Sequence, residues 1–126
     1  MASRSIDDLL AEARTGLERM SPAEVQRADG VVLVDIRTES QRERHGVVPG
    51  SRYVPRNVLE WRLDPSSDYR DPDLARDDVR VVLMCQEGYQ SSLAAATLQQ
   101  LGHEDATDVI GGFTAWRDAG LPIERL

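Results

Sequence analysis

The sequence predicts a single α/β domain with a largely parallel sheet, because short apolar runs alternate with helical segments along its 126 residues. Runs of β-branched residues and leucine at 31–36 and 79–84 have the composition of parallel strands that are covered on both faces. Right-handed crossovers through the intervening helices keep such strands parallel. Ligands of sheets of this kind bind beyond the carboxyl ends of the strands, so the functional site is expected at that edge.

Two helices are expected before the first strand. Ser5 begins a capping-box sequence, and the apolar residues that follow recur at helical spacing, which predicts a helix over 6–19. Ser21 begins a second capping box, with Pro22 at the first helical position and Glu24 three residues after the cap. That helix is expected to end near Gly30.

The middle of the chain reads as strand, helix, strand and helix. The central strand at 31–36 precedes a short solvated helix over 38–44 and a Pro49-Gly50 turn. A short strand at 51–54 and a helix over 57–63 follow, and the helix is expected to turn Leu59, Trp61 or Leu63 inward. Proline, serine and charged residues at 64–78 predict a long exposed loop.

The last part of the chain repeats the alternation. After the strand at 79–84, a helix over 91–101 ends at Gly102, the expected position for a left-handed glycine. A short strand at 107–110 and a helix over 113–119 complete the domain, and Trp116 is expected in the core.

Composition excludes several function classes. The net charge of −7 argues against nucleic acid or an anionic membrane as the main partner. All fifteen basic residues are arginine, which excludes chemistry that depends on lysine. No signal peptide or membrane span is recognisable, and the single cysteine cannot form an internal disulfide, so a cytoplasmic protein is expected. His45 and His103 are too few and too far apart to suggest a metal site.

Cys85 is the candidate catalytic residue. It lies between a predicted strand and a predicted helix, where unpaired backbone amides and the helix dipole favour an anion, which for cysteine is the reactive thiolate. Gly88 would permit a tight loop that wraps its amides around the sulfur, and Ser91 and Ser92 would cap the helix and donate hydroxyl hydrogens to the sulfur. The alternative is a small buried hydrophobic side chain.

Three motifs in the correct order resemble the rhodanese-like (sulfurtransferase) family in its single-domain form. They are Gly46-Val47-Val48-Pro49-Gly50-Ser51, Cys85-x-x-Gly88-x-x-Ser91, and Val109-Ile110-Gly111-Gly112-Phe113-x-x-Trp116. The resemblance covers 21–123 and leaves 1–20 as an N-terminal helical extension. It implies a three-layer sandwich with a mostly parallel five-stranded sheet, no cofactor, and a Cys85 persulfide that carries sulfur from a small-molecule or protein donor to a thiol acceptor.

The resemblance also implies an active-site loop and supporting residues. The loop comprises Gln86, Glu87, Gly88, Tyr89, Gln90, Ser91 and Ser92. Asp35 and Arg37 are expected to form an ion pair that supports it, against the alternative of helix capping and a surface charge. Tyr89 is expected either to wall the pocket and select the donor or to be an exposed loop aromatic.

The loop departs from the common family pattern at two positions. Gln90 stands where many members have arginine, and Glu87 adds a negative charge, so we expect a donor that is less charged than thiosulfate, such as a persulfide. Arg56 or Arg62 is a candidate to supply the missing positive charge, although a solvated arginine is the alternative for each.

Other readings of the chain remain open. A phosphatase or arsenate reductase is disfavoured because Ser91 stands where cysteine phosphatases have arginine. A non-catalytic interaction or redox-sensing module is the second class. The N-terminal helix is expected to pack either on the domain or on a partner, a homodimer included.

Overall fold

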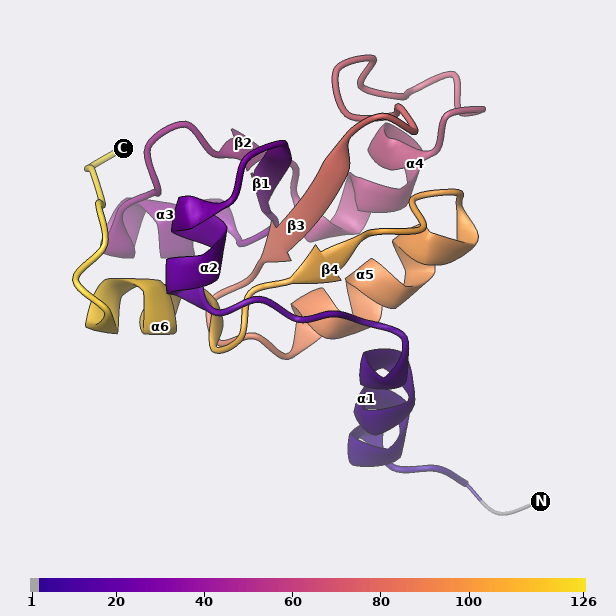
Figure 1. Cartoon of the computed structure of the whole chain (residues 1–126), viewed down its shortest axis with the longest axis horizontal. Helices are drawn as coiled ribbons and strands as arrows, with labels where there is room; N and C mark the ends of the chain where they lie inside the picture. Colours follow the sequence, from indigo (N-terminus) through magenta and orange to yellow (C-terminus); the bar gives the residue numbers. More distant parts are fainter. Residues whose placement is uncertain (1–2) are drawn as a thin grey trace.

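The computed structural model describes residues 3–126, which form a parallel sheet between two layers of helices (Figure 1). The strands are β1 (Val31–Asp35), β2 (Arg52–Tyr53), β3 (Arg80–Met84) and β4 (Thr107–Asp108). The helices are α1 (Ile6–Thr15), α2 (Pro22–Arg27), α3 (Glu39–His45), the 3₁₀ turn η1 (Arg56–Val58), α4 (Leu59–Leu63), α5 (Gln90–Gln100) and α6 (Gly112–Asp118). None of the helices in residues 3–126 is long and apolar enough to cross a membrane.

Within residues 3–126 the sheet has four strands rather than the five that the family resemblance implied. Their order is β2-β1-β3-β4, and all neighbouring pairs are parallel. Beyond β4, Met20 makes a single parallel bridge to Val109. A longer strand cannot form there, because Ser21 is already the N-cap of α2 and turns the chain into a helix.

The predicted helix starts are confirmed by side-chain caps. Ser5, Ser21 and Thr38 each accept a hydrogen bond from the backbone three residues later, and all three caps are reciprocal capping boxes. The first helix is shorter than the predicted 6–19, because it ends at Gly16. No residue of α1 is fully buried, so this helix rests on α5 without entering the core.

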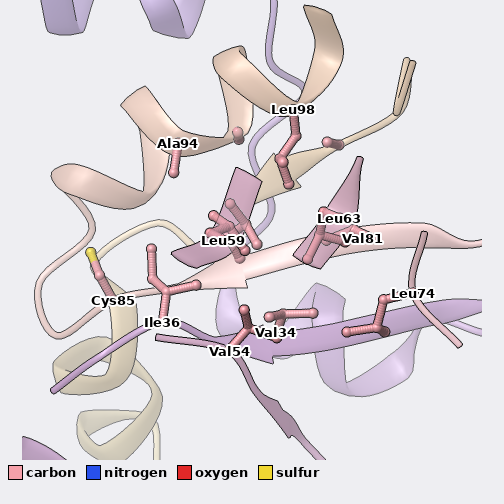
Figure 2. Packing of buried hydrophobic residues seen from close by; sticks show 13 residues of the cluster. Val34, Ile36, Val54, Leu59, Leu63, Leu74, Val81, Cys85, Ala94 and Leu98 are labelled. Carbon is pink, nitrogen blue, oxygen red and sulfur yellow. The ribbon is translucent and has the colours of Figure 1, made fainter. Parts of the chain in front are cut away.

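Alternating residues of β3, continued by Cys85, belong to two separate hydrophobic clusters on opposite faces of the sheet. Val81, Leu83 and Cys85 belong to a cluster that also takes Leu98 from α5 and Leu63 from α4 (Figure 2). The opposite face of the sheet packs against the second cluster, which includes Val82, Met84, Val109, Phe113 and Trp116. This alternation is the two-residue period of a strand, and it places Cys85 on the α5 side.

The segment between α4 and β3 is the long loop that the composition predicted.

The side chains of α4 divide between the core and solvent. Leu59 and Leu63 are fully buried, whereas Trp61 is 57% exposed. Of the three candidates to turn inward, Leu59 and Leu63 do so and Trp61 faces solvent.

Candidate active site

Cys85 directly follows β3 at the carboxyl edge of the sheet. Figure 2 shows its sulfur at the loop end of the core cluster, directed toward the beginning of α5. The residue is only 2% exposed, so the thiol lies beneath the loop rather than open to solvent. A reagent must enter through the loop or displace part of it to reach Sγ.

The sulfur has one amide donor, not the ring of amides that the sequence predicted. Within residues 3–126, the backbone N–H that donates to Sγ is that of Gly88, at 3.1 Å. Gly88 has φ of +86°, the left-handed region that glycine adopts without strain, and this conformation turns its amide back toward the sulfur. The loop is therefore tight at Gly88, whose amide supplies the hydrogen bond to the sulfur.

The two serines do not cap α5, which begins after Tyr89 without a side-chain cap. Ser91 and Ser92 instead donate their hydroxyl hydrogens to Oδ2 of Asp108, at 2.7 and 2.8 Å. Because the Ser91 hydrogen points to Asp108, its oxygen accepts a hydrogen bond from Sγ of Cys85 at 3.3 Å. In this arrangement Sγ is the donor to Ser91, and within residues 3–126 Ser92 makes no hydrogen bond to the sulfur.

Asp108 reaches this position because of strand register. It pairs with Leu83 on the neighbouring strand β3, so its side chain lies on the same face as Leu83 and Cys85. The carboxylate is fully buried and is bound by Arg19, whose Nε lies 2.8 Å from Oδ1. A buried carboxylate needs such a cation and hydrogen-bond donors to offset its desolvation.

Two arginines from the N-terminal segment hold the loop from the same side. Arg14 donates from Nη2 to the carbonyl of Gly88 at 2.8 Å and from Nε to Oγ of Ser92 at 3.0 Å. Arg19 donates from Nη2 to the same Gly88 carbonyl at 3.1 Å. Gly88 is thus bound to the sulfur through its amide and to two guanidinium groups through its carbonyl.

Asp35 and Arg37 form the expected ion pair, with Nη2 of Arg37 2.9 Å from Oδ2 of Asp35 and both side chains fully buried. Arg37 also donates to Oε1 of Gln86 at 3.1 Å and to the carbonyl of Gly46 at 2.8 Å. Its guanidinium lies 4.0 Å from the ring centroid of Phe113. The pair therefore joins the end of β1, the Cys85 loop and α6.

The beginning of α6 fits closely beneath the loop. Phe113 donates its amide to the carbonyl of Cys85 at 2.9 Å, and Thr114 donates to the carbonyl of Gln86 at 3.0 Å. Gly112 has φ of +61°, and a Cβ atom at this position would lie 2.4 Å from the Cys85 carbonyl oxygen. Glycine is required here for both its conformation and its lack of a side chain.

A shallow pocket of about 410 Å³ adjoins the loop. Its lining includes Arg37, Tyr53, Arg56 and Gln90. Burial raises the pKa of the Tyr53 phenol above its usual range, and the negative charge of Glu39 adds to the effect, so the phenol remains a donor to the Arg37 carbonyl at 2.9 Å.

The two candidate substrate-binding arginines differ in position. Arg56 lines this pocket, but Glu60 binds its guanidinium at 2.9 Å and neutralises the charge. Arg62 is exposed and donates to the carbonyl of Tyr69, so it belongs to the long loop rather than to the site. Glu87 and Tyr89 are exposed, and Tyr89 is therefore the exposed loop aromatic of the two alternatives.

Sequence reasoning missed Arg14, Arg19 and Asp108. An acidic residue inside a predicted buried strand was an available signal for Asp108, because such a residue needs a partner. The arginines carried no comparable signal, since both lie in a polar segment and their contacts are more than 60 residues away along the chain.

Residues 21–119 match the model of the rhodanese-like domain. The chain is a member of the rhodanese-like domain family. Among the rhodanese-like relatives, a thiosulfate sulfurtransferase GlpE of Pseudomonas syringae is 36% identical over 105 residues, which cover 82% of this chain and 90% of the relative. A sulfurtransferase of Allochromatium vinosum is 33% identical over 95 residues, covering 75% and 79% of the two chains. Two proteins named adenylyltransferase and sulfurtransferase UBA4 are longer, and this chain spans 26% of each.

One solved structure resembles nearly the whole of this rhodanese-like chain. It is a protein of unknown function from Rhodopseudomonas palustris, described as a possible tyrosine phosphatase. It is 40% identical, with a TM-score of 0.90, and the match covers 98% of this chain and 97% of that one. The match is long enough to include α1, which precedes the residues that the family model matches.

Proposed function

We propose that this rhodanese-like domain is a sulfurtransferase in which Cys85 carries a sulfane sulfur from a donor to a thiol acceptor. The observation that carries the proposal is the position of Cys85. Its Sγ lies at the carboxyl end of β3 within a tight loop, bound by the Gly88 amide at 3.1 Å, in a chain whose relatives include named sulfurtransferases.

The proposed transfer is balanced without an external oxidant or reductant. The Cys85 sulfur attacks the outer sulfur of a donor persulfide, the donor S–S bond breaks, and its electron pair leaves with the donor thiolate. That thiolate takes up the proton that Cys85 loses, so R–S–SH and Cys85–SH become R–SH and Cys85–S–SH. An acceptor thiol then attacks the outer sulfur and regenerates Cys85.

The Ser91 hydroxyl can stabilise the anion that Cys85 becomes when its proton has left for the donor thiolate. In the resting arrangement Sγ donates to Ser91, whose own hydrogen is bound by Asp108. When the sulfur becomes an anion, rotation of the Ser91 hydroxyl would turn its hydrogen to Sγ. Asp108 would still be bound by Ser92 and Arg19, so the carboxylate would not be left without donors.

The charges around the loop favour a donor that is less anionic than thiosulfate. The fully buried Asp108 is two hydrogen bonds from Sγ, Glu87 adds a second carboxylate, and Gln90 brings no cation. Arg56 reaches the adjoining pocket already paired with Glu60. A monoanionic persulfide meets less repulsion there than a dianion does.

The burial of Cys85 favours a second candidate, a redox-sensing or interaction module that does not turn over. A thiol with 2% exposure reacts only when the loop opens, which suits a sensor as well as an enzyme.

A phosphatase role, which the description of the Rhodopseudomonas palustris structure gives as possible for that protein, fits this site less well. The position of the phosphate-binding arginine in cysteine phosphatases is Ser91, and its hydroxyl is committed to Asp108.

Intact-protein mass spectrometry after incubation with cysteine persulfide or thiosulfate tests the proposal. We expect the wild type to gain one sulfur that dithiothreitol removes, and Cys85→Ser to gain none. Gln90→Arg is the matched probe of donor charge, and it should raise loading from thiosulfate more than loading from the persulfide. No adduct from either donor would favour the sensing module, and equally efficient loading of the wild type by both donors would contradict the inference about charge.

A further inference from the structure

The N-terminal segment contributes a part of the Cys85 site that lies outside the matched family domain. The family model begins at residue 21, whereas Arg14 and Arg19 precede it. Both side chains nevertheless reach the loop and bind the same carbonyl, that of Gly88. Their guanidinium groups are half-buried between the end of α1, the loop and β4.

From these contacts we propose that Arg14 and Arg19 are positioning residues for sulfur transfer, which fix Gly88 so that its amide faces the sulfur of Cys85. This inference rests on the proposed function. Gly88 is the residue on which both sets of contacts meet, since its N–H donates to Sγ and its carbonyl accepts from both arginines. A glycine at φ of +86° has wide conformational freedom. Gly88 also packs against the backbone of Gly111 and Gly112, and the two guanidinium groups are the side-chain donors that hold its carbonyl.

The arginines also bring two positive charges to a loop that has carboxylates beside it. Arg19 binds the buried carboxylate of Asp108, which leaves the charge of Arg14 without a carboxylate among its hydrogen-bond partners. The two arginines therefore offset the two carboxylates, Asp108 and Glu87, without the net positive charge that would attract a dianionic donor. The guanidinium of Arg14 beside Gly88 and Ser92 still favours an anionic sulfur over a neutral one during transfer.

The contacts of Arg14 with the Cys85 loop do not arise from burial of α1 in the hydrophobic core. No residue of α1 is buried, and Ile6 and Leu9 on this helix are 62% and 43% exposed. Arg14 is the last basic residue of the helix, and it contacts the loop through Gly88, Ser92 and the ring of Tyr89, whose centroid lies 5.9 Å away. Polar contacts with the Cys85 loop thus attach α1 in addition to its packing on α5.

The test compares Arg14→Met with Arg14→Lys and with the control Arg4→Met. Methionine keeps an unbranched apolar stem but removes both hydrogen bonds and the charge, whereas lysine keeps the charge. Arg4 is an exposed arginine of the same segment that pairs with Glu12 instead of the loop. The readouts are sulfur loading from cysteine persulfide, hydrogen exchange of the Gly88 amide, the rate of Cys85 alkylation by iodoacetamide, and urea unfolding.

We expect Arg14→Met to lower the maximal loading rate about tenfold, with a change of less than about twofold in the donor concentration at half-maximal rate. Exchange of the Gly88 amide and alkylation of Cys85 should both become faster. Arg14→Lys should recover part of the rate, and Arg4→Met should match the wild type. The double variant Arg19→Met/Asp108→Asn removes the second anchor without leaving a buried unpaired charge, and its Gly88 amide should also exchange faster.

The inference is overturned if Arg14→Met loads sulfur, is alkylated at Cys85 and exchanges its Gly88 amide at the wild-type rates. It is also overturned if the loading rate falls only as far as the loss of folding stability accounts for. The proposed function fails in a different way, through a wild type that gains no sulfur from any donor. In that case the exchange and alkylation readouts still decide whether Arg14 positions Gly88.

Discussion

Replacing Gly112 by alanine should push the beginning of α6 away from the Cys85 loop and distort the loop. Its added Cβ would lie 2.4 Å from the Cys85 carbonyl oxygen and 2.8 Å from the Gly88 nitrogen, both of them backbone atoms that cannot rotate away. Contacts below 3.0 Å are essentially never observed for Cβ atoms, so α6 and the loop must separate by at least about 0.6 Å. The separation weakens the bonds from the Phe113 and Thr114 amides to the loop carbonyls.

The expected loss in the free energy of unfolding has two parts, one from backbone conformation and one from the close contact. A non-glycine residue at φ of +61° costs about 1–2 kcal/mol, and two weakened hydrogen bonds add about 2 kcal/mol, for a total of about 3–4 kcal/mol. Gly120→Ala is the matched control, because Gly120 has φ of +73° but has nothing within 4 Å of an added Cβ. Only the conformational cost should apply to it.

Urea unfolding monitored by tryptophan fluorescence measures both variants, with the free energy of unfolding obtained by linear extrapolation. Gly112→Ala should lose about 2 kcal/mol more than Gly120→Ala, and it should also lose sulfur loading at urea concentrations where it is folded. Equal losses in the two variants, with wild-type loading in Gly112→Ala, would refute the close approach of α6 to the loop.

Three further predictions concern stability. Arg37→Met should lower the free energy of unfolding by about 3–5 kcal/mol in urea titrations, because it leaves the buried Asp35 without its main cation, and a loss under 1 kcal/mol would contradict that account. Leu63→Ala should cost about 2–5 kcal/mol by the same assay, whereas Trp61→Ala on the same helix should stay within about 0.5 kcal/mol; the opposite ranking would show that α4 is oriented differently. Hydrogen bonds from the backbone and side chain of Ser66 lower the pKa of Asp64 below its usual 3.8, so this carboxylate stabilises the fold above that pH and the benefit is lost as pH falls through the folded-state pKa. Unfolding at a series of acid pH values should therefore show a smaller decline for Asp64→Asn than for the wild type, and parallel declines would exclude this contribution.

The strands and helix starts could be predicted because their signals are local. Capping boxes at Ser5, Ser21 and Thr38 depend on residues three positions apart. The continuous apolar runs of β1 and β3 indicate strands that are buried on both faces. The shorter first helix and the missing fifth strand depend on where the chain turns after Gly16 and before Ser21. These turns are set by tertiary contacts, among them the pairing of Met20 with Val109.

The site was predictable at its centre but not at its edges. The position of Cys85 at the end of a strand followed from the apolar run before it, and the Asp35–Arg37 pair was implied by the family resemblance. The predicted ring of amides is wrong, because within residues 3–126 the backbone hydrogen bond to Sγ comes from Gly88 alone. The Asp108 network joins three distant segments, so the acidic residue in a buried strand indicates that a partner is needed but not which residues supply it.

Transfer of sulfur in a single turnover tests the central claim most directly. Cys85 is loaded with radiolabelled sulfur from a persulfide donor, the protein is separated from the donor, and a small thiol acceptor is added. We predict that the label leaves the protein stoichiometrically and appears on the acceptor as a persulfide, while Cys85 returns to the free thiol. Label that never loads onto Cys85, or that stays on it in the presence of excess acceptor, would contradict the account.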